Sequence, residues 1–136
     1  MTAPIDLRAT QRCYCLAARK RARAITRLFD DRLRPHGLRS TQFSVLAVLS
    51  LRGPTSVGEL AGLLGLERTT LTRSAALMER NGWIRAALSG DARRRPLALT
   101  ESGQRTLEGA FPAWQEAQQI VESGWSGGSD GRPGAP

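Results

Sequence analysis

A helical period of apolar residues in the middle of the chain predicts two short helices joined by a tight turn. Ser56 can cap the first helix, and Glu59 stands three residues later, as in a capping box. The apolar stripe of that helix consists of Val57, Leu60, Ala61 and Leu64. Gly65 can end the helix in a left-handed conformation, and Leu71 provides an apolar anchor for the next helix. This order of cap, stripe, turn and anchor is typical of a helix-turn-helix.

Longer helical segments are expected on both sides of this pair. Residues 6–33 contain few helix breakers and end at Pro35-His36-Gly37, which predicts one long helix. A second helix over 42–51, opened by Ser40 or Thr41, is apolar nearly all round and is therefore expected in the core. Gly53-Pro54 ends it.

A last helix begins after a cap at Thr100, and Pro112 predicts that it is kinked or divided. Its apolar stripe consists of Leu107, Ala110, Phe111, Trp114, Ala117 and Ile120. Such a stripe either completes the core of one chain or packs against the first helix and a second copy. From Ser123 onward, glycine, serine and proline dominate, which predicts a disordered tail over 123–136.

Two short apolar segments, 83–86 and 97–99, predict a β-hairpin after the helix-turn-helix. Gly90-Asp91 marks a turn between them, and Arg93, Arg94 and Arg95 follow in succession. Arginines on a narrow projection can enter a minor groove, where the negative potential is high. A solvated loop is the alternative, but the position one hairpin after a helix-turn-helix favours a basic wing that binds DNA.

Polar side chains cover the outward face of the second helix of the pair. They are Arg68, Thr69, Thr70, Thr72 and Arg73. Arginine can bond bidentately to guanine, and threonine offers a hydroxyl and a methyl group to bases and phosphates. An ordinary helix hairpin with a solvated face is the alternative. The agreement of caps, turn and polar face favours a DNA-reading helix.

The charge distribution also favours a protein that binds DNA. The chain of 136 residues has a formal net charge of +8, and residues 1–100 carry 18 Arg and Lys against 7 acids. Residues 101–136 carry 2 against 5. A basic region followed by a mildly acidic one fits a nucleic-acid-binding protein better than a protein that is basic throughout.

Other functional classes find little support in the residues. With His36 as the single histidine, in a loop, no metal site and no cofactor are expected. No Ser/His/Asp set, phosphate-binding glycine loop or paired carboxylates argue for an enzyme. The chain has neither a membrane-length apolar run nor an N-terminal signal core, so we expect a cytoplasmic protein.

Four stretches together resemble the multiple-antibiotic-resistance regulator (MarR) family of winged-helix transcription factors. They are 38–49, 60–73, 78–84 and 91–103, the last with an Asp, three arginines and Leu-Thr-x-x-Gly. The resemblance extends from about Cys13 to Gln119. It implies a mainly α fold with a small β-hairpin, a winged helix-turn-helix with N- and C-terminal dimerisation helices, and a homodimer on pseudo-palindromic double-stranded DNA.

The resemblance also implies an organisation and residue roles. Residues 1–37 would hold a dimerisation helix, 38–100 the DNA-binding domain and 101–122 a second dimerisation helix. The recognition helix would cover about Glu67–Arg80, with the five outward residues facing DNA. Arg93 would be the wing arginine, with Arg94 or Arg95 beside it, and Asp91 would hold the wing in place. Family members usually have a further C-terminal helix here, so the dimer interface is expected to be smaller or rebuilt from the first helix.

Release from DNA has two candidate triggers. One is a small apolar or aromatic ligand between the dimerisation and DNA-binding regions, as is typical of the family. The other is oxidation of Cys13 or Cys15, because a cysteine near the start of the first helix resembles the peroxide-sensing branch. Two residues apart in a helix, the two cysteines should not bridge each other, and a small buried apolar role is the alternative.

The leading hypothesis is therefore a transcriptional regulator, a repressor, that binds DNA as a homodimer. The competing hypothesis is a winged-helix protein-protein interaction module whose wing charges bind an acidic partner. Affinity for DNA that falls steeply with salt would distinguish the two.

Overall fold

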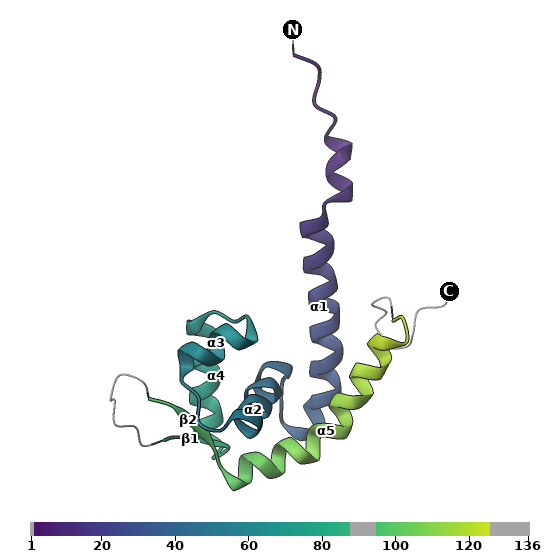
Figure 1. Ribbon diagram of the computed structural model, residues 1–136. Coiled ribbons are helices and arrows are strands. Elements are labelled where there is room, and N and C mark those ends of the chain that lie inside the picture. Colours follow the sequence, from purple (N-terminus) through teal and green to yellow (C-terminus); the bar gives the residue numbers. More distant parts are fainter. Residues whose placement is uncertain (1, 88–94, 126–136) are drawn as a thin grey trace.

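Helices form most of the computed structural model, which describes residues 2–87 and 95–125 (Figure 1). The helices are η1 (Leu7–Arg12), α1 (Tyr14–Leu33), η2 (Arg34–His36), α2 (Ser40–Arg52), α3 (Val57–Leu64), α4 (Arg68–Arg80) and α5 (Glu101–Glu122). The strands are β1 (Ile84–Ala86) and β2 (Leu97–Leu99). The mainly α fold with a small β-hairpin is the one that the sequence predicts.

Strand β2 of the wing hairpin is paired along both of its edges. Strands β1 and β2 are antiparallel, with Ile84 opposite Leu99 and Ala86 opposite Leu97. On the other edge of β2, the Thr55 N–H donates to the Leu97 carbonyl at 3.0 Å, and the Leu97 N–H donates back at 2.9 Å. This bridge, which the sequence pattern did not indicate, fixes the base of the wing to the turn between α2 and α3.

The core lies between α2, α3, α4, the hairpin and the first half of α5. Its fully buried side chains include Leu33, Leu38, Val45, Leu46, Leu60, Leu71 and Met78. Helix α2 is central, as its nearly continuous apolar sequence predicts. Of the two predicted starts, Ser40 is the first helical residue, its N–H donates to Asp30 Oδ1 at 2.7 Å, and Arg39 is the N-cap.

Helix α5 connects the winged part of the molecule to α1. Its ribbon runs beneath the winged part, changes direction between its two halves and then rises along α1 (Figure 1). Pro112 lies inside this one helix, so the prediction of a kink agrees with the ribbon and the prediction of a division is wrong. An ion pair of 3.1 Å between Arg32 and Glu116 joins α1 to the second half of α5.

The expected single helix over 6–33 is interrupted at Cys13. The Cys13 backbone is extended (φ −72°, ψ 114°), and its Sγ accepts the Leu16 N–H at 3.5 Å as the N-cap of α1. Before it, the Asp6 carboxylate caps η1 and the Thr10 hydroxyl donates to the Leu7 carbonyl. Such local side-chain bonds compete with a continuous helix where no tertiary packing enforces one.

Every side chain of the first 19 described positions is exposed. These residues, 2–20, are called the N-terminal arm below, and Figure 1 shows them extending away from the other helices. Tyr14 in the arm is 92% exposed. Within the described part of the chain, no helix is long and apolar enough to cross a membrane.

The chain after α5 turns back onto α1, contrary to the expectation of a disordered tail beginning at Ser123. Trp125 is only 3% exposed and packs with Leu28 and Ala117 in a second small core. The Arg21 guanidinium lies 5.6 Å from the centre of the Trp125 ring and donates to its carbonyl at 2.7 Å. The prediction of a disordered tail is therefore wrong for Ser123–Trp125, because residues of α1 and α5 bury the indole of Trp125. Its remainder, 126–136, lies outside the described residues.

Candidate nucleic-acid interface

The turn between α3 and α4 has the geometry that its sequence predicts. Ser56 Oγ accepts the Glu59 N–H at 3.2 Å and caps α3. Gly65 is left-handed (φ 63°), a conformation that costs glycine little, and the Leu66 N–H bonds back to the Ala61 carbonyl. The turn therefore directs α4 across α3 with a defined start at Arg68.

Helix α4 is held by one face and leaves the opposite face in solvent. Leu71, Ala75 and Met78 are buried against the core. The five residues expected to face DNA, Arg68, Thr69, Thr70, Thr72 and Arg73, are all exposed. At about 100° per residue, Arg73 and Thr69 lie opposite the buried stripe, whereas Arg68 and Thr72 lie on one flank.

Two details refine the chemistry of this face. The Thr72 hydroxyl donates to the Arg68 carbonyl at 2.8 Å, so its oxygen remains available as an acceptor and its methyl group as an apolar contact. Arg80 is also exposed and lies seven residues after Arg73, on the same side of the helix. The sequence interpretation missed Arg80 because it stopped at the first two turns; extending the helical period would have found it.

The wing is only partly within the described residues. Arg95 is exposed just before β2, whereas Arg93, Arg94 and Asp91 lie outside the described part of the chain. On β1, Arg85 is exposed opposite Ala98 and adds a cation that the sequence interpretation did not single out. The described base of the wing is therefore cationic on its solvent side.

The two cysteines are both exposed in one copy of the chain, so neither is buried by its own chain. Cys13 precedes α1 and caps it, while Cys15 lies in its first turn, where Arg19 Nη2 donates to its Sγ at 3.6 Å. The expectation that both lie within one helix is therefore corrected. In one copy of the chain, both thiols are exposed to solvent.

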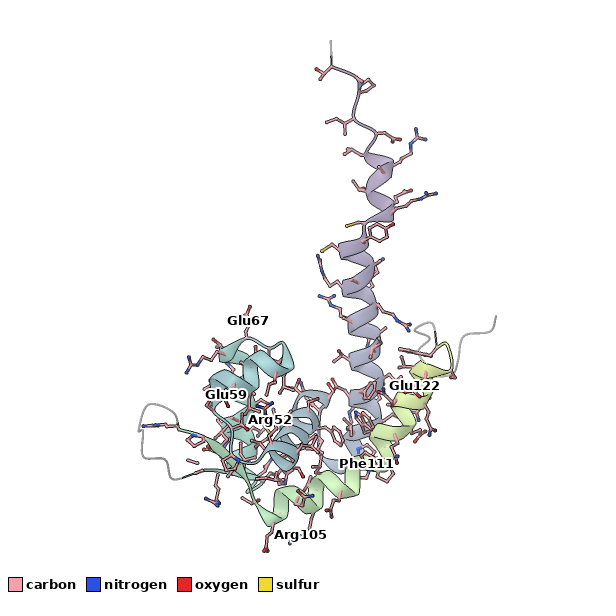
Figure 2. The ribbon with its side chains drawn as sticks, in the orientation of Figure 1. Arg52, Glu59, Glu67, Arg105, Phe111 and Glu122 are labelled. Carbon is pink, nitrogen blue, oxygen red and sulfur yellow. The ribbon has the colours of Figure 1, made fainter. Side chains whose placement is uncertain are left out.

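An apolar hollow of about 500 Å³ lies between α2 and α5. Three aromatic rings stack along it: Trp114 lies with its centre 5.9 Å from that of Phe43 and 5.7 Å from that of Phe111. Phe111 is 46% exposed and lies close to the bend of α5 (Figure 2). The hollow is thus open to a flat apolar molecule between the winged part and α5.

A winged helix-turn-helix with long flanking helices is the class that these elements define. A model described as the MarR family matches residues 36–95. The chain belongs to the MarR family.

Named relatives agree with this assignment. The chain is 34% identical over 87 residues to YwoH of Bacillus subtilis, an HTH-type transcriptional regulator, with 64% of each chain covered. It is 34% identical over 93 residues to the transcriptional repressor MprA of Escherichia coli, covering 64% of this chain and 53% of MprA. The chain thus spans between about half and two thirds of these relatives.

A solved structure extends the likeness over more of the chain. The transcriptional regulator MosR of M. tuberculosis superposes with a TM-score of 0.75 at 39% identity, covering 82% of both chains. A second structure of MosR, in complex with DNA, gives a TM-score of 0.72 at 43% identity over 80% of both chains.

Proposed function

We propose that this chain is a DNA-binding transcriptional regulator, a repressor, that acts as a homodimer on a pseudo-palindromic operator. One observation carries the proposal: α4 is locked by three buried side chains while it presents Arg73 and its neighbours to solvent. A rigid helix with arginine and threonine on its free face suits readout in a major groove. The complex of MosR with DNA and the naming of MprA as a repressor support it.

The proposed homodimer is supported by the exposure of the N-terminal arm, which has no packing partner within the described part of the chain. An isolated helical segment of this length is marginal in water, and the arm exposes apolar residues such as Leu7, Tyr14 and Leu16. Its cations are Arg8, Arg12, Arg19 and Lys20, against the single acid Asp6. The exposed acids of α5 that form no ion pair with the described residues include Glu108 and Glu122. A second copy supplies both the apolar cover and the opposite charge.

Arg73→Ala tests the reading of bases. A good bidentate contact to a base contributes about 1–3 kcal/mol, so we expect a loss of affinity in that range for the operator and a smaller loss for unrelated DNA. Fluorescence anisotropy on the DNA upstream of the chain's own gene, with a shuffled duplex as comparison, measures both. An equal loss on the two duplexes would make Arg73 a phosphate contact.

The competing interaction module is tested by the wild-type chain in the same assay. For a DNA-binding protein, the logarithm of the affinity falls linearly with the logarithm of the salt concentration, because phosphate contacts release counterions. Binding that is undetectable at low salt, or independent of salt, would overturn the DNA-binding proposal and leave the interaction module.

We propose the hollow between α2 and α5 as the site of a flat aromatic effector. Its wall of stacked rings offers a further stacking position, and the hollow joins an element of the winged part to α5. Ala47→Trp should fill the hollow and abolish binding of the fluorescent probe 1-anilinonaphthalene-8-sulfonate while leaving DNA affinity unchanged. Unaltered probe binding in this variant would place any effector elsewhere.

We propose oxidation of the exposed thiols as a second means of release. A thiolate attacks one oxygen of a peroxide, the O–O bond breaks, and sulfenic acid and hydroxide form. A thiol of the second copy can then displace water to give an intersubunit disulfide. Hydrogen peroxide should release the wild type from DNA and not a Cys13→Ser, Cys15→Ser variant. Equal release of both proteins would exclude the cysteines.

A further inference from the structure

A second hollow, of about 480 Å³, lies where α1 meets α2, on the side of α4. Residues that line it include Asp30, Arg34, Arg39, Gln42 and Leu77. They come from the end of α1, the start of α2 and the third turn of α4. The hollow therefore joins the flanking helices to the same helix that presents the candidate DNA-reading residues.

Of the charged residues that line this hollow, Arg34 forms an ion pair, whereas Asp30 and Arg39 form none within the described part of the chain. Asp30 accepts the Ser40 N–H through Oδ1 at 2.7 Å, and Arg34 forms an ion pair of 3.0 Å with Asp31. Arg39 is exposed and forms no ion pair with residues 2–87 or 95–125. Arg39 is also the N-cap of α2, at the positive end of that helix. At the rim of the hollow, the Arg39 side chain is thus an exposed cation without an ion-pair partner among the described residues, and Asp30 is the unpaired acid of the same lining.

The buried amide of Gln42 orders this rim. Gln42 is only 5% exposed, and its Oε1 accepts the Arg39 N–H at 3.0 Å. The Arg39 carbonyl in turn accepts the Phe43 N–H at 3.0 Å. The backbone of Arg39 is therefore held in place by α2, while its side chain remains in solvent. The guanidinium is free to turn toward a ligand.

The rim at Arg39 adjoins the exposed face of α4 through Leu77. Leu77 is 40% exposed and lines the hollow. Arg73 lies one turn before it and Arg80 one turn after it on the same side of α4. A polymer of negative charge that lies along Arg73 and Arg80 therefore passes the rim that carries Arg39.

We propose that Arg39 binds a backbone phosphate of DNA, beside the bases that α4 reads. The inference rests on the proposed DNA-binding function and adds a contact outside the recognition helix and the wing. The arginine fork matches the oxygens of a phosphate, and such contacts fix the register of a protein on the duplex without reading sequence. Arg39 is thus a positioning residue.

Arg39→Ala tests the proposal through the salt dependence of binding. Loss of one phosphate contact should lower the slope of log affinity against log salt by about one unit and weaken operator and shuffled duplex by a similar factor. Arg39→Lys should keep the slope. Because the cap of α2 uses the backbone of residue 39, unfolding by urea should be unchanged in both variants.

Arg105→Ala is the matched control, since it removes one exposed arginine from a helix outside the proposed interface. Figure 2 shows Arg105 at the bottom of the view, below the winged part, and Glu67, the N-cap of α4, at the top of the winged part. Its slope should equal that of the wild type. If Arg39→Ala also keeps the wild-type slope, the phosphate contact is wrong. If Arg105→Ala lowers the slope as much, net charge and not position explains the effect, which overturns the proposal as well.

The failure of this inference differs from the failure of the proposed function. A wild type without salt-dependent DNA binding overturns the function itself, whereas a steep wild-type slope with an unaltered Arg39→Ala slope overturns only the contact. Inorganic phosphate distinguishes a free anion from DNA. The melting temperature of the wild type without DNA should be equal in phosphate and in chloride at one ionic strength. Stabilisation by phosphate that disappears in Arg39→Ala would assign the rim to a free anion instead.

Discussion

The winged part of the molecule and the N-terminal arm both contain apolar helical residues. In the winged part these residues are buried, whereas in the arm they are exposed. Leu71 in α4 has no exposed surface, whereas Leu16 in the first turn of α1 is 41% exposed. Both leucines lie in helices, so local helix formation does not explain the difference. The winged part contains the partners that cover its apolar stripes, and the arm does not. Helical sequence thus predicts an element, but only packing makes it stable.

The comparison also separates two kinds of function. In the winged part, rigidity is useful because a DNA-reading face must hold its geometry before the DNA arrives. In the arm, exposed apolar and basic residues form a surface that awaits a second copy. We therefore expect substitutions in the winged part to change the free energy of unfolding, and substitutions in the arm to change association.

Leu71→Ala should have the largest effect on stability. Deleting a fully buried leucine side chain costs about 2–5 kcal/mol, through lost burial and the cavity left behind. Urea unfolding followed by circular dichroism measures the loss, and DNA binding should fall with it. Leu77→Ala in the same helix is the control, and a loss as large as that of Leu71→Ala would contradict the division between the two faces of α4.

Trp125→Ala should cost about 1.5–3 kcal/mol, the free energy of burying one large apolar side chain. The measurement tests whether the second small core contributes to the free energy of unfolding, as the winged part does, or leaves it unchanged, as the arm should. Trp125→Phe retains most of the apolar volume and should restore most of the stability. If Trp125→Ala unfolds at the wild-type urea concentration, the contact with Leu28 and Ala117 contributes nothing to the fold.

Ser56→Ala should cost about 1 kcal/mol, because the Glu59 N–H at the start of α3 loses its side-chain acceptor. Urea unfolding of the variant gives the value. Ser56→Asp retains an acceptor and is the matched control. A wild-type stability in Ser56→Ala would mean that water replaces the cap without loss.

Changing Tyr14 and Leu16 together to alanine should have the smallest effect on the fold. Exposed substitutions change the free energy of unfolding by about 0.5 kcal/mol or less, so a dilute monomer should unfold as the wild type does. Sedimentation at higher concentration should show a weaker dimer. A monomer that is strongly destabilised would show that the arm already packs within one chain.

Much of the candidate interface follows from local rules. The cap at Ser56, the left-handed Gly65 and the outward face around Arg73 are all set by residues within two turns of one another, so the sequence predicts them. Arg39 could not be found that way. Its relation to Arg73 depends on the packing of α4 against the start of α2, which brings residues more than thirty positions apart in the chain to one surface.

The sequence by itself determined the order of the main elements, the caps of α3 and α5, the turn and the amphipathic faces, because each depends on residues a few positions apart. The tertiary structure decided what long-range contacts control. It placed Thr55 beside β2, seated Trp125 between α1 and α5, and interrupted the first helix at Cys13 where nothing packs to continue it. Whether an apolar residue is buried depends on what the rest of the chain places beside it. The composition near Trp125 indicated a disordered tail. In the structure, α1 and α5, which are far apart in the sequence, bury Trp125 in a small core.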